Sequence, residues 1–349
     1  MLKDYLRAPD TRATLVVIVV LLALAAVLDP FRLNLMGKYM SFAFVALGIV
    51  LLWGYGGVLS LGQGLFFGAG GYMMAMFLKL EASAPELPDF MVWSSLDKLP
   101  SWWQPFHSFP LTLLLIVVLP AVVAYLLAYL IFQKRVGGVY FAIVTLSLAL
   151  TGTVLIVGQQ GDTGGANGIT DFRTLMGLDI VSDDAKQALY FVEAAVLAVA
   201  MVLCVALMRS RFGKVLIAIR DKEDRVRFSG YNTAHMKAFV FAISALLSSI
   251  GGAFYSLQVG LISPTAVGVV ASVEMVIYAA VGGRLSIAGA VIGALLVGFL
   301  KSYLSEAFPE FWLYFLGALF IAVVAFMPLG IAGVVQRVAA GRIDKGATS

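Results

Sequence analysis

The chain has 349 residues, of which 61% are hydrophobic and 13% are charged, and its mean hydropathy is +0.96. Because a soluble domain has about 45–50% apolar and about 25% charged residues, this composition excludes a water-soluble globular protein. The net charge of +4 and the single cysteine, Cys204, exclude a strongly basic nucleic-acid-binding protein, a disulfide framework and a cysteine-based metal site.

Apolar segments recur along the whole chain. A membrane-spanning helix needs about 20 mostly apolar residues, and we predict about ten such helices in an all-α polytopic membrane protein, with 1–349 as a single transmembrane domain. A cleaved signal peptide is the alternative for 1–28, but its removal would leave an odd number of helices. The predicted spans are 14–28, 38–53, 58–78, 110–132, 138–158, 188–208, 238–259, 268–284, 286–303 and 311–328.

Basic residues are distributed unevenly over the loops of this arrangement. With the N-terminus in the cytosol, 17 Lys/Arg residues fall on the cytoplasmic side and 7 on the external side. This agrees with the positive-inside rule, so we predict that the N-terminus and the C-terminus are cytoplasmic. The loops 79–109 and 159–187, which are rich in acidic residues, are then external, and the loop 209–237 is cytoplasmic.

The third predicted span, 58–78, mixes small and polar residues. Its Gly-xxx-Gly pair has the spacing that lets helices touch backbone to backbone. Two interpretations stay open: close glycine packing, or an interrupted helix that offers polar groups to a passing solute. We include Ser60 and Gln63, with Thr145 of the fifth span, among the candidate residues of a substrate path.

The two external loops differ in character. Loop 79–109 contains four prolines and three tryptophans, a mixture that suits the membrane surface, either as a lid or docking platform or only as an aromatic anchor. Loop 159–187 begins with a glycine-rich stretch that lacks the Gly-Lys-Ser/Thr ending of a phosphate loop, so it is not a nucleotide site. Its candidate contacts with a solute or partner are Gly164, Gly165, Asn167 and Asp171.

The loop 209–237 is the one long run of charge, with eight Lys/Arg residues. We expect Ala218 to Gly230 to form a short helix and turn inserted into a cleft of a partner protein, because its charged side chains suit charge-assisted contacts. The simpler explanation is a solvated surface of positive-inside charge. The candidate coupling residues are Arg220, Asp221, Glu223, Arg225 and Gly230.

Glu274 is the only carboxylate that we place well inside a span, the eighth. A charge at that depth costs about 2.5–3.5 kcal/mol on insertion scales, so it should face protein or water and have a partner. It is either a structural group between helices or part of the substrate path. If the ten spans are two inverted sets of five, the third and eighth spans correspond, as in inverted-repeat transporters.

The chain offers little for catalysis. Its two histidines, His107 and His235, fall in loops on opposite sides of the membrane, and no metalloprotease, hydrolase or phosphate-loop motif occurs. A solute-translocating subunit is therefore the leading hypothesis, a membrane enzyme is weaker, and a scaffold is weaker still. No metal or cofactor is expected. With one buried ionisable residue, the chain is better suited to a separate ATPase than to an ion gradient.

Several motifs together resemble one family. Arg211-Phe212-Gly213-Lys214, the stretch Ala218–Glu223 and Gly230-Tyr231-Asn232 look like the cytoplasmic loop of the LivH/LivM group of ABC importer permeases. The stretch Leu59–Tyr72 resembles the glycine-rich helix of the same group, and Glu274 with Gly282-Gly283 and Gly289 resembles its penultimate-helix pattern. Together these motifs cover most of the chain.

Within that group, two external stretches look most like the urea-transporter (UrtC-type) permease. They are Leu87–Val92 and Asp162–Phe172, whereas Gln159-Gln160 departs from the usual urea-type pattern. The resemblance implies a type II ABC importer-like permease in a bacterial inner membrane. It would work with a second homologous permease, two cytoplasmic ATPase subunits and an external solute-binding protein.

The kinds of polar side chain in the predicted spans favour a small neutral solute. By this topology no Lys or Arg falls deep in a span, whereas hydroxyl and amide groups do. Urea needs hydrogen-bond acceptors without fixed charge pairs, whereas an amino acid needs a cation for its carboxylate and an acid for its ammonium group. We therefore predict transport of urea or short amides, with a branched-chain amino acid as the alternative.

Overall fold

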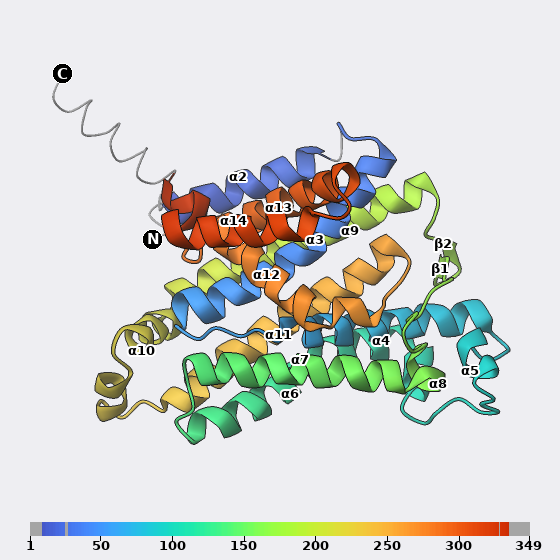
Figure 1. The fold of residues 1–349 in the computed structure, drawn as a ribbon, viewed down its shortest axis with the longest axis horizontal. Coiled ribbons are helices and arrows are strands. Elements are labelled where there is room, and N and C mark those ends of the chain that lie inside the picture. Colours follow the sequence, from blue (N-terminus) through green and yellow to red (C-terminus); the bar gives the residue numbers. More distant parts are fainter. Residues whose placement is uncertain (1–8, 25–26, 328, 335–349) are drawn as a thin grey trace.

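The computed structural model describes residues 9–24, 27–327 and 329–334. In Figure 1 the long helices run side by side, with α10 at one end of the bundle and α5, α8, β1 and β2 at the other. The elements are α2 (Pro9–Leu24), α3 (Pro30–Ile49), the π-helix η1 (Val50–Tyr55), α4 (Gln63–Ser83), α5 (Asp89–Trp93), the 3₁₀ helix η2 (Gln104–His107), α6 (Phe109–Gln133), α7 (Val139–Gly158), α8 (Gln160–Thr163), β1 (Thr174–Leu175), β2 (Leu178–Asp179), α9 (Asp183–Arg209), α10 (Arg211–Phe228), α11 (Thr233–Val259), the 3₁₀ helix η3 (Pro264–Ala266), α12 (Val269–Gly282), α13 (Ile287–Ala307) and α14 (Trp312–Phe326).

Two buried helices, α3 and α11, form the centre of the bundle. α11 packs against α3, α4 and α6, and α3 packs against α9, α12 and α13 as well. Phe44 on α3 and Phe241 on α11 are among the largest fully buried side chains. The remaining helices are therefore arranged around this pair.

The outer helices α6 and α7 expose large apolar side chains. Leu126 and Leu130 on α6 and Val154 on α7 each have more than half of their surface exposed. Extended apolar patches of this kind are rare on monomeric soluble proteins. These faces suit lipid chains or another membrane protein.

Glycines bring the backbones of α4 and α11 into direct contact. A Cβ atom at Gly252 would lie 1.8 Å from the carbonyl oxygen of Phe67, and one at Gly70 would lie 1.9 Å from that of Ser249. No side chain fits between the two helices at these points. This is the close glycine packing that one interpretation of the third span predicts.

The third span begins later than the sequence predicts. Residues 57–60 have no regular secondary structure, and α4 starts at Gln63 rather than at 58. Gly57 has φ +70°, and a Cβ there would lie 2.7 Å from Cγ of Arg220, so the turn needs glycine for both reasons. A break in the helix and glycine packing are thus both present, one after the other.

Each of the ten predicted spans overlaps a helix, but only six described helices have the length and hydropathy of a complete span. The shorter apolar helices are Thr11–Leu24, Val269–Gly282 and Trp312–Val323. The number of crossings therefore stays a prediction. Both termini and residues 25–26 and 328 lie outside the described residues, so the sidedness of the chain ends is not tested.

The three predicted loops contain more regular structure than expected. Loop 79–109 holds the end of α4, α5 and η2, and loop 159–187 holds α8, the β1–β2 hairpin and the start of α9. The helix and turn predicted over 218–230 are present, as the second part of the longer helix α10 followed by a turn at Ser229–Gly230. α10 is kinked at Lys222, which has non-helical φ and ψ.

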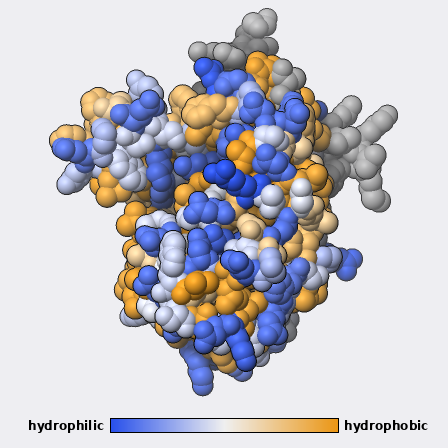
Figure 2. Space-filling view, turned by 90° about the vertical axis from the view of Figure 1, so that its right-hand side faces the viewer, coloured by the Kyte–Doolittle hydropathy of each residue, from blue (hydrophilic) through white to orange (hydrophobic). Residues whose placement is uncertain are grey.

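Figure 2 faces the end of the bundle that carries α5, α8 and the hairpin. Hydrophilic residues cover much of this face, and hydrophobic residues gather in patches between them. Trp93 and Trp102 are largely exposed, as an aromatic anchor or a docking platform requires. The choice between those two roles stays a prediction.

We predict that Gly252→Ala destabilises the protein. The added methyl group collides with the Phe67 carbonyl, so α4 and α11 must move apart, and overpacking of this kind costs about 1–3 kcal/mol. The thermal unfolding midpoint in detergent should fall. The control is Gly317→Ala on α14, where a Cβ meets no atom within 4 Å and the better helix former should be neutral or slightly stabilising. Equal midpoints for the two variants would contradict backbone contact at Gly252.

Candidate functional site

A charge pair joins α12 to α13 inside the bundle. Nζ of Lys301 lies 2.7 Å from Oε1 and 2.8 Å from Oε2 of Glu274, and the Tyr278 hydroxyl donates a hydrogen bond to Oε1 of the same carboxylate. Glu274 is 6% exposed, so most of its water has been replaced by these partners. The expectation that Glu274 needs a partner is therefore met.

Two lysines that the sequence analysis did not consider as path residues lie within helices and form ion pairs. Lys301 is six residues from the end of α13, and Lys79 on α4 is buried and paired with Asp89 at 3.0 Å. The sequence-based count put both lysines on the external side, with Lys79 in the loop 79–109 and Lys301 near the end of the predicted span 286–303. A single lysine within an apolar stretch could have predicted such a pair, because a buried cation in lipid needs a counter-charge just as a buried carboxylate does.

The Glu274–Lys301 pair lines a cavity of about 620 Å³. The walls come from α3, α7, α11, α12, α13 and α14 and from the segment around η3, and most of them are apolar. Ala166 of the glycine-rich loop also reaches the cavity. Its lining residues are Phe42, Leu150, Thr153, Val157, Ala166, Tyr255, Pro264, Thr265, Ala266, Gly268, Val269, Val270, Ala271, Glu274, Lys301 and Trp312.

The other predicted path residues lie elsewhere. Gln63 is fully buried and its amide is satisfied within the core, donating to Oγ of Ser244 (3.0 Å) and accepting from Oγ of Ser248 (2.9 Å). Oγ1 of Thr145 accepts from the backbone N–H of Leu61 at 3.1 Å. Ser60, also buried, accepts from the N–H of Gly62. These groups hold the helix break in place, and their role in a substrate path stays a prediction.

The glycine-rich loop is attached to the wall of the cavity. Ile169 and Ile262 exchange two backbone hydrogen bonds of 2.9 and 3.0 Å, forming an isolated antiparallel bridge. Gly164 and Gly165 are buried with positive φ, whereas Asn167 and Asp171 are exposed. The loop therefore turns sharply, as predicted, and presents the two polar side chains outward.

The two predicted external loops are fastened to each other. The carboxylate of Glu81, near the end of α4, accepts hydrogen bonds from the N–H groups of Met176 (2.9 Å) and Gly177 (2.7 Å) at the tip of the β1–β2 hairpin. Trp103 donates from Nε1 to the carbonyl oxygen of Asp162 at 2.9 Å. Together these contacts make one cap at the end of the bundle near the glycine-rich loop.

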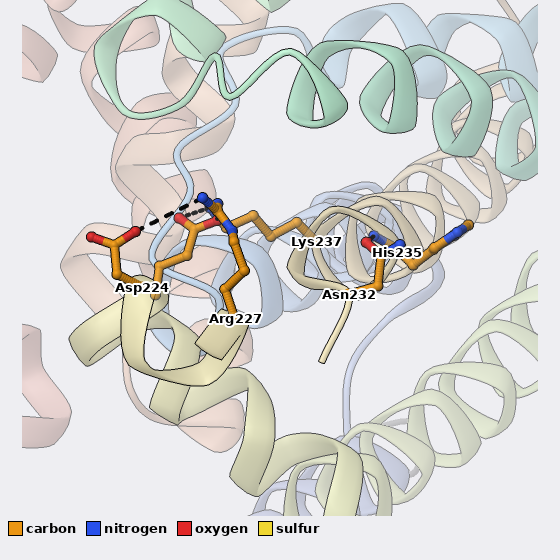
Figure 3. Close-up of polar contacts among 6 residues, drawn as sticks. Asp224, Arg227, Asn232, His235 and Lys237 are labelled. Atoms are coloured by element: carbon orange, nitrogen blue, oxygen red, sulfur yellow. Dashed lines mark hydrogen bonds and ion pairs between the residues drawn. The ribbon is translucent and has the colours of Figure 1, made fainter. Parts of the chain in front are cut away.

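At the opposite end, α10 is held by charged groups. Nη1 of Arg220 donates to the carbonyl oxygen of Gly54 at 2.7 Å, and its Nε pairs with Asp221. Glu223 pairs with Arg227 at 3.0 Å and with Lys237 of α11 at 2.5 Å. Figure 3 shows Lys237 and Arg227 reaching toward the same point, whereas His235 points away from it.

The remaining predicted coupling residues are on the surface. Arg225 and Gly230 are exposed, and Gly230 has φ +88°. The Asn232 side chain accepts from the N–H of His235 and so caps α11 after the turn. The segment is thus a fixed helix-and-turn rather than only a flexible charged loop.

The environment of Glu223 has a defined effect on its ionisation. Burial alone would raise the pKa of this carboxyl, but the hydrogen bond and charge of Lys237, aided by Thr233 and Arg227, hold the pKa below its ordinary value. Glu223 is therefore ionised at neutral pH and fastens α10 to the start of α11.

Among the described residues, no group of three or more His, Cys, Asp or Glu side chains is placed to hold a metal ion. The buried Cys204 lies in α9. Glu193 on the same helix is fully buried and accepts hydrogen bonds from Ser41 (2.8 Å) and Gln258 (2.9 Å), so the prediction that Glu274 is the only carboxylate well inside a span is wrong.

Residues 31–324 match the family model of the branched-chain amino acid transport system / permease component. The chain belongs to this family. It is 24% identical over 314 residues to LivM, a high-affinity branched-chain amino acid transport system permease protein of Salmonella typhimurium, and the match covers 84% of this chain and 68% of LivM. No solved structure matches the chain at a significant level.

Two other relatives match shorter parts. The xylose transport system permease protein XylH of Escherichia coli is 34% identical over 124 residues, which are 33% of this chain and 31% of XylH. The branched-chain permease protein BraD of Pseudomonas aeruginosa is 30% identical over 126 residues, 36% of this chain and 41% of BraD. This permease is a transport component and not an enzyme, so the membrane-enzyme alternative is wrong.

We predict that removing one member of the Glu274–Lys301 pair destabilises the permease more than removing both. Breaking a buried ion pair by deleting one partner costs about 3–5 kcal/mol, and the one-third exposure of Lys301 places the loss at the lower end. Lys301→Met should cost more than Glu274→Gln, because it abandons the more buried charge. The double variant should recover most of the thermal unfolding midpoint. Additive losses in this double-mutant cycle would show that the pair is not coupled.

We predict that Glu223→Gln loosens the start of α11. Because the pKa of Glu223 is lowered in the folded protein, its stabilisation is present above the unfolded pKa and is lost as pH falls through the folded pKa. The partly exposed pair contributes about 1 kcal/mol, so amide hydrogen exchange near Lys237 should be about fivefold faster in the variant at pH 7. The difference should vanish in acid.

The matched control for this experiment is Asp224→Asn. Asp224 is 86% exposed and lies 3.8 Å from Arg227, so its removal should change the exchange rate little. An equal acceleration in both variants would assign the effect to net charge rather than to the Glu223–Lys237 contact.

Proposed function

We propose that this permease is a subunit of an ATP-driven importer that carries urea or short amides across the bacterial inner membrane. Its partners are a second homologous permease, two cytoplasmic ATPase subunits and an external solute-binding protein. The observation that best supports this function is the cavity with a self-neutralised charge pair among the apolar helices. A charged helix-and-turn lies at the opposite end of the bundle from the glycine-rich loop (Figure 1).

The cavity suits a solute that makes hydrogen bonds but carries no net charge. Among the described residues that line it, the only charges are Glu274 and Lys301, and each neutralises the other. Urea has four N–H donors and one carbonyl, so it can bind the exposed edge of this pair and the hydroxyls of Thr153 and Thr265 without separating the charges. The cavity thus differs from the path without charge pairs expected from the sequence, because it contains a charge pair that is neutral overall.

A branched-chain amino acid is the second candidate, and a specific observation favours it. The largely apolar wall, which includes Phe42, Val269 and Trp312, offers space for an aliphatic side chain, and LivM is a relative over most of this chain. An amino acid, however, would have to compete with the existing pair to place its own two charges. Separating paired charges in a low-dielectric cavity is costly, which is why we favour urea.

The 209–237 segment is the proposed site of contact with the ATPase. Arg225, Lys222 and Asp221 are exposed on α10, available for charge-assisted contacts across an interface, while Arg220 and Glu223 anchor the same helix to the membrane-spanning part. Reversing the charge of Arg220 and Glu223 would therefore weaken the coupling of ATP hydrolysis to the membrane-spanning helices as well as assembly with the ATPase.

We predict saturable uptake of labelled urea by the complete complex in proteoliposomes, with little competition from leucine. Glu274→Gln should lower the uptake rate about tenfold or more, since a charge-assisted hydrogen bond contributes about 1.5–3 kcal/mol and 1.4 kcal/mol is a factor of ten. The amount of assembled complex should fall much less. Glu306→Gln, at an exposed position near the end of α13, is the matched control.

Saturable leucine uptake that urea does not inhibit would replace urea by the branched-chain alternative. An equal loss of uptake in Glu274→Gln and Glu306→Gln would leave the pair a structural role only.

A further inference from the structure

The π-helix η1 continues α3 at the end of the bundle that carries α10. It contacts both α10 and the turn between α12 and α13. η1 runs over Val50–Tyr55 and is mostly buried. π-helical turns are rare and occur frequently at functional sites, because their wider winding leaves backbone groups free for other partners. Here the carbonyl oxygen of Gly54 accepts the hydrogen bond from Arg220 of α10.

The opposite side of η1 carries the turn between α12 and α13. A Cβ at Gly54 would lie 1.7 Å from the carbonyl oxygen of Arg284, so the two backbones touch. The Tyr55 hydroxyl donates to the carbonyl oxygen of Leu285 at 3.1 Å, and the guanidinium of Arg284 lies 5.8 Å from the centre of the Trp53 ring. Three consecutive residues of η1 therefore hold this turn.

The turn is the rigid base of the helix hairpin that bears the charge pair. A Cβ at Gly282 would lie 2.0 Å from the carbonyl oxygen of Gly289, and one at Gly293 would lie 2.3 Å from that of Tyr278. The backbones of α12 and α13 are thus in contact near the turn, and farther along the two helices carry Glu274 and Lys301. Close-packed elements of this kind shift as units rather than deform continuously.

There is also room for movement at the α10 contact. A cavity of about 740 Å³ lies beside it, lined among others by Gly57, Gly138, Arg220 and Lys237. The kink of α10 at Lys222 comes directly after Arg220 and Asp221. The part of α10 that carries Arg220 can therefore tilt relative to the part that Glu223 fastens to α11.

We infer that η1 transmits the movement of α10 to the α12–α13 hairpin and so couples ATP hydrolysis to the geometry of the Glu274–Lys301 pair. The route runs from Arg220 to Gly54, and from Tyr55 to Leu285. It rests on the proposed function, since it assumes that an ATPase acts on α10. Tyr55 is a positioning residue in this scheme, because it acts through the backbone of Leu285.

The test uses the complete complex in lipid and measures both ATP hydrolysis and solute uptake. Tyr55→Phe removes only the hydroxyl that binds Leu285, so we expect normal assembly and about a threefold rise in ATP hydrolysed per solute transported. Arg220→Lys should raise the same ratio. Because both substitutions act on one route, the ratio of ATP hydrolysed to solute transported should be no higher in the double variant than in the more affected single variant. Tyr314→Phe, an exposed tyrosine of α14 that lines neither cavity, is the matched control.

A second measurement follows the hairpin directly. In a Cys204→Ala background, Val270→Cys places a thiol on the exposed wall of the 620 Å³ cavity. Its labelling rate should change when the ATPases are trapped with vanadate, and Tyr55→Phe should reduce that change. Tyr314→Phe should leave the change in labelling rate intact.

The outcomes separate the route from the proposed function. An unmodified complex without solute-stimulated ATP hydrolysis would contradict the function and the route together. A coupled unmodified complex in which Tyr55→Phe keeps the normal ratio and labelling change would overturn the route alone. The route would also be overturned if Tyr55→Phe and Arg220→Lys lowered uptake and ATP hydrolysis in the same proportion and if their effects multiplied in the double variant. That result would show that each substitution damages the structure independently.

Discussion

Direct contact between helix backbones at glycine residues holds the centre of this permease together. In lipid, apolar side chains gain little by leaving one apolar surface for another, so helices associate through close packing and hydrogen bonds. Gly252 and Gly70 bring α4 and α11 together, and Gly293 does the same for α13 against α12. These approaches fix the inner elements of the bundle, because α11 packs against α3, α4 and α6.

That tight packing also sets where polar groups can lie. Gln63, Ser244 and Ser248 satisfy one another inside the core, so α4 and α11 are locked by hydrogen bonds as well as by shape. The Glu274–Lys301 pair instead borders a cavity. Its two charges compensate each other, so the pair offers polar atoms to a solute without adding net charge to the cavity. This is the physical reason why the proposed solute is neutral.

The two ends of the bundle are built differently. Near the glycine-rich loop, Glu81 and Trp103 fasten the loops to one another through backbone groups. At the α10 end, contacts are made by charged side chains that reach across elements, from Arg220 to η1 and from Glu223 to α11. A fixed cap at one end and a kinked, charge-held helix at the other suit a protein that receives a mechanical signal from one side.

The amino-acid sequence by itself determined the membrane class, the helical segments and the family motifs, because hydropathy and composition are local properties of the chain. It also required a partner for Glu274, since an isolated charge in lipid is costly. It did not indicate that the partner is Lys301, that Gln63 bonds to α11, or that Arg220 reaches Gly54, 166 positions away in the chain. Those pairings depend on which helix faces meet, and only the tertiary packing around the glycines decides that.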